Sequence, residues 1–493
     1  MKLNNYILEI LSFSKERKTL LTIIAGRVGV AICGIISVKI STIYLTPSDL
    51  GSLSELNSLV YFFFITMIAP VSHFVIRGFL EWNDHGILNI IIKKFITYTI
   101  SIAFLASLIS LILQLNWVVV KGFDFLSLSF LVFAFIIFQT LNGIGTTGLN
   151  LFGQRKIYTI FTNLVAWSSL VLSVVIYFLI PSKISWSFGQ LLGFILGSLS
   201  LCFLWKKFNK HDGLNNNNQF NALPFSKKKI IEFSWPFIFT STLWWFQTQS
   251  YRFVLGHEHK IEFVGYFVTA YSLAAMPVMI SEGIIAQYLE PTFYNRLKYQ
   301  DQFGQANAWN DYARLFLPGI AVVSVFVAFS TPFLAKIFLG GAFQATAMKV
   351  TALAALIEAM RSAGTMMFHL GMAKLDNKMT IWPAAVGALV APLSVYILCK
   401  YDPLYGTIAG LLLAGILVLF TNILLSFRVL PVKWPFKRIM YALLLTIPAC
   451  MILKLVSLIF KEPTYFVSII TLASTGIYIA VLLFYLLSSK YSK

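Results

Sequence analysis

The apolar stretch TALAALIEAMRSAGTMMFHLG, residues 351–371, carries an acid and a base near its middle and His369 toward its end. The acid Glu358 and the base Arg361 are three residues apart, so on a helix they share one face and can interact. One interpretation is a self-neutralising pair that only fixes helix packing. The other is a pair beside an aqueous cavity, where Arg361 attracts an anion and Glu358 takes up a proton.

Five more basic residues lie inside apolar stretches: Arg27, Lys39, Arg252, Lys349 and Lys454. A charge costs about 2.5–3.5 kcal/mol at the centre of a membrane helix, so it must pair, reach the interface or face water. Arg252, Lys349 and Lys454 lie near helix ends, where their long stems could reach the interface. Arg27 and Lys39 lie deeper, about 18 Å apart along one helix. A cavity explains those two better, and Arg252 and Lys349 remain candidates for the same cavity.

Two further acids lie inside apolar stretches, Glu55 close to a helix end and Glu282 about two turns from one. A carboxylate surrounded by hydrocarbon is suited to taking up a proton, so Glu55, Glu282 and Glu358 are candidate coupling acids. Glu282 could equally pair with Arg27 or with Arg361. The excess of buried bases over buried acids favours an anionic ligand.

These residues must be positioned by membrane-spanning helices. The 493-residue chain is 58% hydrophobic and only 12% charged, about half the charged share of a soluble protein. Apolar runs long enough to cross a bilayer predict fourteen helices, among which 49–75 and 262–288 are the weakest. The fourteen predicted helices lie near residues 20–44, 49–75, 91–115, 125–151, 157–180, 186–208, 230–255, 262–288, 312–337, 344–371, 379–399, 403–428, 438–459 and 464–487.

The distribution of lysine and arginine gives the orientation of these helices. With a cytoplasmic N-terminus, 26 of the 38 basic residues fall in inner segments and six in outer loops. Such a bias is the positive-inside signal, so we expect both termini in the cytoplasm. Most of the +19 formal charge is then a topology signal with some attraction to membrane lipids, and a nucleic-acid partner is not expected.

The longest polar stretch divides the chain. We expect an N-terminal lobe of six helices (1–208), a cytoplasmic linker (209–229), a C-terminal lobe of six helices (230–430) and a final helix pair (431–493). In each lobe an acid precedes a glycine and the next helix, as Asp49-Leu50-Gly51 and as Glu262-Phe263-Val264-Gly265. Repeats of this kind are common in transporters.

Several classes of function lack their sequence features. The outer loops are too short for the catalytic domain of a membrane glycosyltransferase or polysaccharide polymerase, so we do not expect an enzyme. No nucleotide-binding G-x-x-x-x-G-K-[ST] loop occurs, so transport would depend on a gradient. His257-Glu258-His259 has the residue types of a metal site but not the spacing, and we expect a solvated outer loop there. We expect neither a metal nor another cofactor.

Several stretches resemble the MOP exporter superfamily, and within it the Wzx-type polysaccharide flippases. YLTPSDLGSLSELNSLVYFF (44–63) resembles the family's first outer turn and second helix, and FGQRKIYTI (152–160) its fourth-to-fifth loop. FSWPFIFTSTLWWFQTQSYRFVLG (233–256) and VGYFVTAYSLA (264–274) resemble its seventh and eighth helices. The family's Asp-Arg pair at the end of the seventh helix stands here as Tyr251-Arg252.

The resemblance implies an all-α polytopic membrane protein with two lobes in a V. It implies a flippase that moves an undecaprenyl-pyrophosphate-linked oligosaccharide, such as an O-antigen unit of lipopolysaccharide, across the bacterial cytoplasmic membrane by alternating access. Polysaccharide polymerases are possible partners. In this interpretation Arg27, Lys39, Arg252, Lys349 and Arg361 attract the pyrophosphate. A lipid II flippase and a MATE-type multidrug exporter are the alternatives, although MATE proteins usually have twelve spans and expel cations.

Overall fold

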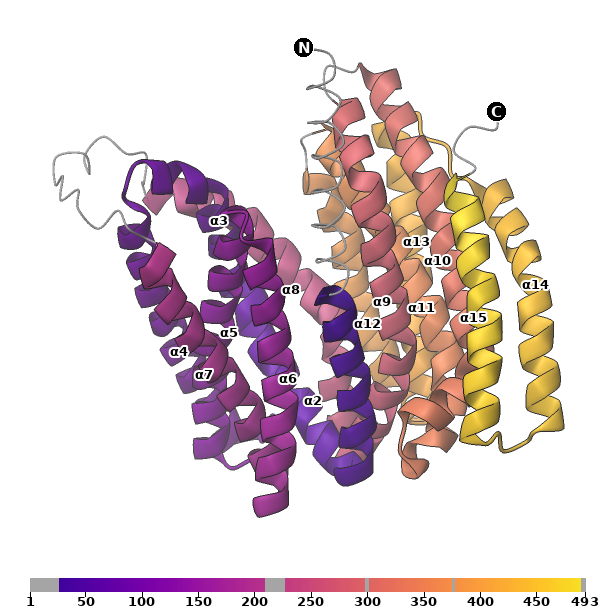
Figure 1. Ribbon diagram of the computed structural model, residues 1–493, viewed down its shortest axis with the longest axis horizontal. Helices are drawn as coiled ribbons and strands as arrows, with labels where there is room; N and C mark the ends of the chain where they lie inside the picture. Colours follow the sequence, from indigo (N-terminus) through magenta and orange to yellow (C-terminus); the bar gives the residue numbers. More distant parts are fainter. Residues whose placement is uncertain (1–25, 209–226, 298–300, 375–376, 489–493) are drawn as a thin grey trace, which may run out of the picture. The chain divides into compact units, whose positions relative to one another are not determined.

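The computed structural model describes residues 26–208, 227–297, 301–374 and 377–488, and in these ranges the chain is helical with no strand (Figure 1). The expected cytoplasmic linker, up to residue 226, and both termini lie outside the described residues. The helices are Gly26–Tyr44, α2 (Pro47–Phe63), η1 (Phe64–Ile68), α3 (Ala69–Asp84), α4 (Leu88–Trp117), α5 (Phe125–Leu151), α6 (Arg155–Leu179), α7 (Lys183–Phe208), α8 (Lys227–Glu258), α9 (Ile261–Leu297), α10 (Gln302–Phe338), α11 (Gly341–Lys374), η3 (Asn377–Thr380), α12 (Ile381–Leu398), α13 (Tyr405–Val429), α14 (Phe436–Ile459) and α15 (Tyr465–Ser488).

Each of the fourteen predicted spans corresponds to a helix in the described part of the chain, with α2, η1 and α3 forming one continuous span. The largest differences are at three ends, of which the first is the end of α3 at Asp84, nine residues past the predicted 75. The α9 helix runs nine residues past the predicted end at 288, and α10 begins ten residues before the predicted start at 312. Apolar periodicity marks only the part of a helix that lies in hydrocarbon, whereas these ends are polar and continue the helix beyond it.

Twelve of the described helices are long and apolar enough to cross a membrane by length and composition. The expectation that 49–75 and 262–288 would be the weakest spans was wrong, because both belong to helices that meet this criterion. Helices α8 and α11 do not meet it. The α11 helix carries Lys349, Glu358 and Arg361, so the helix with the predicted charged site is also one with a weak membrane signal.

Local sequence explains where several helices begin and bend. The side chains of Asp124 and Asp301 accept the backbone N–H groups of Ser127 (2.9 Å) and Gly304 (2.8 Å), and so cap the first turns of α5 and α10. Between α2 and α3 the backbone widens into the π-helix η1, just before Pro70, which has no N–H to donate. The Tyr98 hydroxyl donates to the Met67 carbonyl there, at 2.8 Å.

The chain forms two compact units. Unit 1 comprises residues 1–37 and 55–241, and unit 2 comprises residues 38–54 and 242–493. The chain passes from one unit to the other inside three helices: Gly26–Tyr44, α2 and α8. In unit 1, α6 packs along α7 and α5 packs against both α4 and α7. The Asn142 amide of α5 ties this unit together by donating to the Phe194 carbonyl (2.7 Å) and the Ser198 hydroxyl (2.8 Å) of α7.

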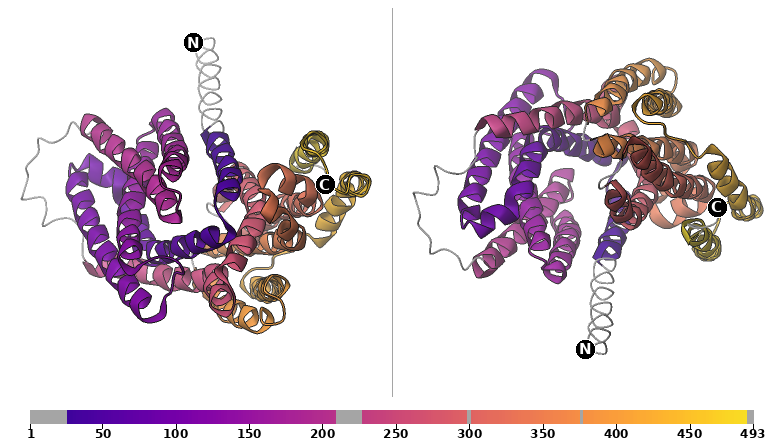
Figure 2. Two further views of the ribbon diagram at one scale, coloured as in Figure 1. Left: turned by 90° about the horizontal axis from the view of Figure 1, so that it is seen from below. Right: turned by 90° about the horizontal axis from the view of Figure 1, so that it is seen from above.

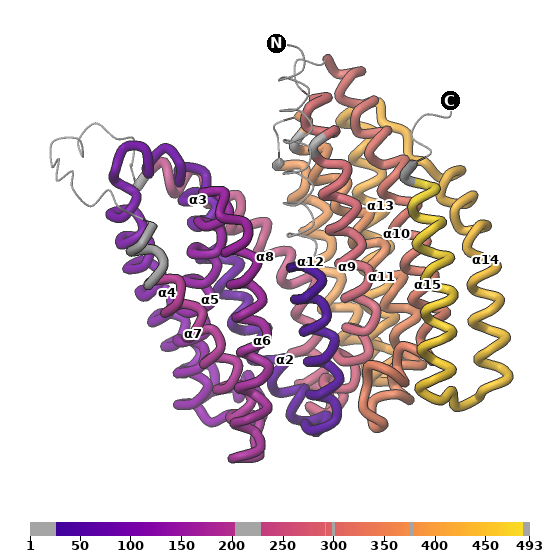
Figure 3. The backbone as a smooth tube through the Cα atoms, in the orientation of Figure 1, coloured from indigo at the N-terminus to yellow at the C-terminus, as the bar shows by residue number. Residues whose placement is uncertain are grey.

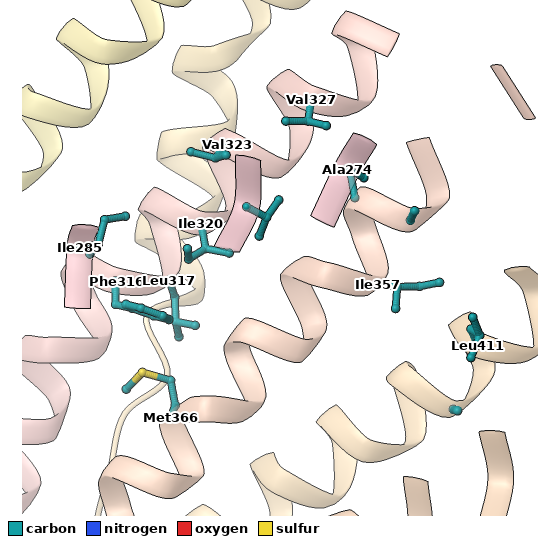
Figure 4. Packing of buried hydrophobic residues seen from close by; sticks show 14 of the residues in the cluster. Ala274, Ile285, Phe316, Leu317, Ile320, Val323, Val327, Ile357, Met366 and Leu411 are labelled. Carbon is teal, nitrogen blue, oxygen red and sulfur yellow. The ribbon is translucent and has the colours of Figure 1, made fainter. Parts of the chain in front are cut away.

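Unit 2 is a helical bundle around α9, α10 and α11, each of which packs against the other two. Its core is a cluster of buried apolar side chains, including Ala274 and Ile285 of α9, Phe316 and Ile320 of α10, and Ile357 of α11 (Figure 4). The α14–α15 pair packs against α10, and the end-on views in Figure 2 show this pair on one side of the bundle. The bundle therefore holds α9 and α11 side by side, which positions the predicted charges.

The two glycines of the predicted repeat, Gly51 and Gly265, lie against each other where α2 crosses α9 within unit 2. A Cβ atom on Gly51 would overlap the Ile261 carbonyl oxygen, and one on Gly265 would overlap the Pro47 carbonyl oxygen. The contact is reciprocal, because each glycine faces the carbonyl four residues before the other. A crossing this close leaves no room for a side chain on either helix.

We expect Gly265→Ala to destabilise the protein by about 1–3 kcal/mol, because the two backbones must move apart to admit the methyl group. Gly283→Ala is the matched control, since it lies in the same helix and a Cβ there would meet no atom within 4 Å. Thermal unfolding of the purified protein in detergent measures both. Equal unfolding temperatures for the two variants would contradict the close crossing.

Candidate functional site

A buried cluster of three charges joins α9 to α11. The Arg361 guanidinium donates from Nε to Glu358 Oε2 at 2.7 Å and from Nη2 to Glu282 Oε2 at 2.6 Å. The side chain of Glu358 is 5% exposed, that of Glu282 18% and that of Arg361 22%. We call these three residues the charge triad. Of the two partners expected for Glu282, Arg361 is therefore the one it contacts, and the predicted contact between Glu358 and Arg361 is present.

Two hydroxyl groups complete the triad. The Tyr271 hydroxyl of α9 donates to Glu358 Oε1 at 2.7 Å, and the Ser362 hydroxyl of α11 donates to Glu282 Oε2 at 2.8 Å. A buried carboxylate is tolerated only where hydrogen bonds and an opposite charge replace the water it has lost. With both acids ionised, the triad carries one excess negative charge.

The triad still has unused bonding capacity. Among the described residues, Arg361 Nη1 donates to no atom and Glu282 Oε1 accepts from none. A guanidinium has five N–H donors, so two of them remain for an anion at Nη1. Glu282 is more exposed than Glu358 and has an oxygen without a partner in the described chain.

The triad depends on the parallel course of α9 and α11, whose traces run side by side in Figure 3. The connecting helix α10 is antiparallel to both, so α9 and α11 run in the same direction. Residues at the same level along the two helix axes therefore face each other. The Thr351 hydroxyl donates to the Ala270 carbonyl at 2.9 Å nearer the start of both helices. Eight residues after Glu282 and Arg361, about 12 Å further along, a second ionisable pair occurs in the same register.

This second pair is Glu290 of α9 and His369 of α11. The His369 Nε2 atom lies 3.5 Å from Glu290 Oε1, and its Nδ1 lies 3.0 Å from the Thr365 carbonyl. The imidazole is buried and packs against the ring of Tyr312, with centroids 4.5 Å apart. Sequence analysis noted His369 but did not assign Glu290 to a site. The shared spacing of eight residues, 282 to 290 and 361 to 369, is the signal that could have found the pair.

Lys39 lies in unit 2 beside the end of α10. Its ammonium donates to the Leu339 carbonyl at 2.6 Å and lies 3.4 Å from the Lys336 carbonyl and 3.3 Å from the Tyr465 hydroxyl. Carbonyls at the C-terminal end of a helix have no partner within it and attract a cation. These contacts engage all three donors of the ammonium and account for Lys39 without a bound ligand.

Within unit 2, the structure does not bring Arg252 or Lys349 to the triad. In unit 2, Arg252 bonds to the Gln249 side chain and lies over the Tyr251 ring, and the exposed Lys349 lies over the Tyr405 ring. In unit 1, Arg27 of the helix Gly26–Tyr44 is exposed.

Glu55, the third candidate coupling acid, is held by a backbone hydrogen bond. It is 2% exposed and lies in unit 1, where Oε2 accepts the backbone N–H of Lys121 at 3.0 Å. The same loop between α4 and α5 is held by Gln114, which donates to the Phe123 carbonyl and accepts the N–H of Val120. Glu55 therefore anchors the loop between α4 and α5.

The stretch His257-Glu258-His259 does not form a loop of its own, because α8 continues to Glu258. His257 is exposed, and His259 Nε2 lies 2.7 Å from the Cys399 carbonyl. Among the described residues, no group of three or more His, Cys, Asp or Glu side chains could hold a metal ion.

The observations define a class: a multi-pass helical membrane protein with a buried charge site in its second unit. No family model matches the sequence, and no curated protein matches it. Solved structures do match the fold. The lipid II flippase MurJ, in an inward closed conformation, is 16% identical, with a TM-score of 0.64 over 94% of this chain and 98% of its own.

Two structures of multidrug resistance MATE family transporters of the MOP superfamily are also similar. The inward-facing one is 13% identical, with a TM-score of 0.60 over 81% of this chain and 95% of its own. The outward-facing one is 13% identical, with a TM-score of 0.54 over 86% and 94%. At these identities the likeness concerns the fold alone. The chain has the fold of MOP-superfamily transporters. These matches do not distinguish the Wzx type from the other transporters with this fold.

Proposed function

We propose that this protein is a flippase that carries a pyrophosphate-linked oligosaccharide lipid from the inner to the outer leaflet of a bacterial cytoplasmic membrane. The observation that carries the proposal is the charge triad, which holds a guanidinium with two unused N–H donors inside a membrane helix bundle. Hydrocarbon alone would not admit a pyrophosphate or a sugar, because removing their water costs too much. A polar site with unused donors lowers that barrier while the lipid tail stays in the bilayer.

The triad also couples the binding of an anion to the binding of a proton. Its excess negative charge opposes an anion at Arg361, and a proton on Glu282 removes that charge. Anion and proton therefore strengthen each other's binding, and the linkage is reciprocal. A pyrophosphate that crosses with one proton still carries negative charge. A potential that is negative inside drives that charge outward by about 2.3 kcal/mol per unit charge for every 100 mV.

Arg27 enters this proposal as a cation of unit 1 that attracts the anionic headgroup. We expect Arg27→Ala to abolish surface-polysaccharide export in a complementation assay, and Arg27→Lys to retain most of it because the charge is kept. Protein amounts in the membrane are measured alongside. Full export by Arg27→Ala at normal amounts would contradict a role of Arg27 in attracting the headgroup.

A second candidate is lipid II flipping, which the likeness to MurJ over 94% of the chain favours. Both substrates present a pyrophosphate, so the triad serves either one. The excess carboxylate of the triad would also suit a cationic drug, as expected of a multidrug exporter. Transport assays therefore need to compare the oligosaccharide lipid, lipid II and a cationic drug. The two lipids share the pyrophosphate, so a preference between them would reflect the sugar portion.

A further inference from the structure

A second cationic site lies in unit 2, apart from the charge triad. A pocket of about 70 Å³ opens between α9, α10 and the start of α14, and three arginines line it: Arg296, Arg314 and Arg438. Asp311 also lines it and forms an ion pair with Arg296. The pocket lining therefore carries a net charge of +2, which Asp311 does not balance.

The other two arginines bring their positive charge to the pocket wall. Arg438 donates from Nη2 to the Leu486 carbonyl at the end of α15, at 3.0 Å. Arg314 is exposed and forms no ion pair within the described residues. Arg314 and Arg438 are close enough to interact electrostatically, and bringing two like charges together is unfavourable unless an anion joins them.

A buried tyrosine also lines the pocket. Tyr312 is 3% exposed, and in the described part of the chain its hydroxyl has no hydrogen-bond partner. A buried hydroxyl without a partner costs about 1–3 kcal/mol. Thr292 lines the same pocket, with the apolar residues Leu289 and Leu315. Arginines combined with hydroxyl donors are the chemistry that recognises a phosphate.

We propose that this pocket binds a phosphate group, either the headgroup of an anionic phospholipid or a soluble phosphate compound. The charge distribution of the sequence places these helix ends at the cytoplasmic surface. The α14 helix exposes Met440, Leu444 and Met451 along its length, which suits acyl chains below a headgroup held at Arg438. A bound phosphate would link α14 and α15 to α9 and α10, and so stabilise the unit.

The test uses the purified full-length protein, depleted of lipid in detergent. Phosphatidylglycerol, inorganic phosphate and uncharged diacylglycerol are added separately, and binding is followed by native mass spectrometry and thermal unfolding. We expect Arg314→Gln to weaken phosphatidylglycerol binding about tenfold or more, because a charge-assisted hydrogen bond is lost. Arg314→Lys should keep most of the binding. Arg428→Gln is the matched control, an exposed arginine outside the pocket.

The pattern of binding decides the source of the phosphate. Binding of phosphatidylglycerol that inorganic phosphate displaces only weakly identifies a lipid headgroup. Equal binding of inorganic phosphate identifies a soluble compound, and both results support the site. Absence of binding by the wild type, equal loss in Arg314→Gln and Arg428→Gln, or binding of diacylglycerol as strong as that of phosphatidylglycerol would each overturn the proposal. None of these readouts depends on transport.

Discussion

Replacement of Arg361 by Gln is expected to stop transport and to destabilise the protein by about 3–5 kcal/mol. The change leaves Glu282 and Glu358 in the bundle without their shared counter-charge, and an uncompensated buried charge has a cost of this size. It also removes the two guanidinium donors proposed to bind the substrate phosphate. Thermal unfolding in detergent measures the first effect, and flipping in liposomes measures the second.

A neutral triad separates the two roles of Arg361. In the triple variant Arg361→Met, Glu282→Gln, Glu358→Gln no charge remains to be compensated, so much of the lost stability should return, as for other buried ion pairs replaced together. Transport should not return, because the phosphate-binding donors are absent. A stable triple variant with normal transport would show that the triad only fixes the packing of α9 against α11.

Replacement of Glu282 by Gln is expected to remove the pH dependence of headgroup binding. In the wild type, binding should strengthen from neutral to acidic pH, because a proton on Glu282 removes a negative charge beside Arg361. The neutral amide of the variant would imitate the protonated acid at every pH. Removing a charge at this distance changes the binding free energy by up to about 4 kcal/mol at an effective dielectric constant near 20. Binding of a pyrophosphate-linked lipid across a pH series measures the effect.

The control for this prediction is Glu290→Gln, the same change eight residues further along the same helix. Glu290 contacts His369 and is not bonded to Arg361, so the pH dependence of binding at equilibrium should survive its loss. If Glu282→Gln retained the wild-type pH dependence, or if Glu290→Gln abolished it, Glu282 would not be the acid that couples proton to substrate.

Much of the fold could be predicted from the sequence, because a bilayer imposes a simple rule. Long apolar runs bounded by charges marked all fourteen helices, and the limits of α5 were predicted to the residue. The ends of α9 and α10 were missed by nine and ten residues, since hydropathy does not report a helix that continues into a polar environment. The acid–glycine repeat was noticed, but its meaning as the crossing of Gly51 and Gly265 needed the structure.

The candidate site was only partly predictable. The i, i+3 spacing gave the contact of Glu358 with Arg361, because neighbours on one helix follow from helix geometry alone. Two contacts between α9 and α11 could not be predicted in this way: Glu282 with Arg361, and Glu290 with His369. They depend on how far one helix is shifted along its axis relative to the other. Lys39 contacts the Leu339 carbonyl at the C-terminal end of α10, 300 residues away in the sequence. No local sequence pattern predicts such a contact.

One measurement tests the central claim most directly. The purified protein is reconstituted into liposomes that contain a fluorescent undecaprenyl-pyrophosphate oligosaccharide, lipid II or a cationic dye, with and without an imposed potential. A membrane-impermeant reagent then reports how much of each compound reaches the opposite leaflet or side. We expect the wild type to move a pyrophosphate-linked lipid, faster when the receiving side is positive, and the Arg361→Gln protein to move none. Export of the dye alone, with both lipids left in place, would contradict the account.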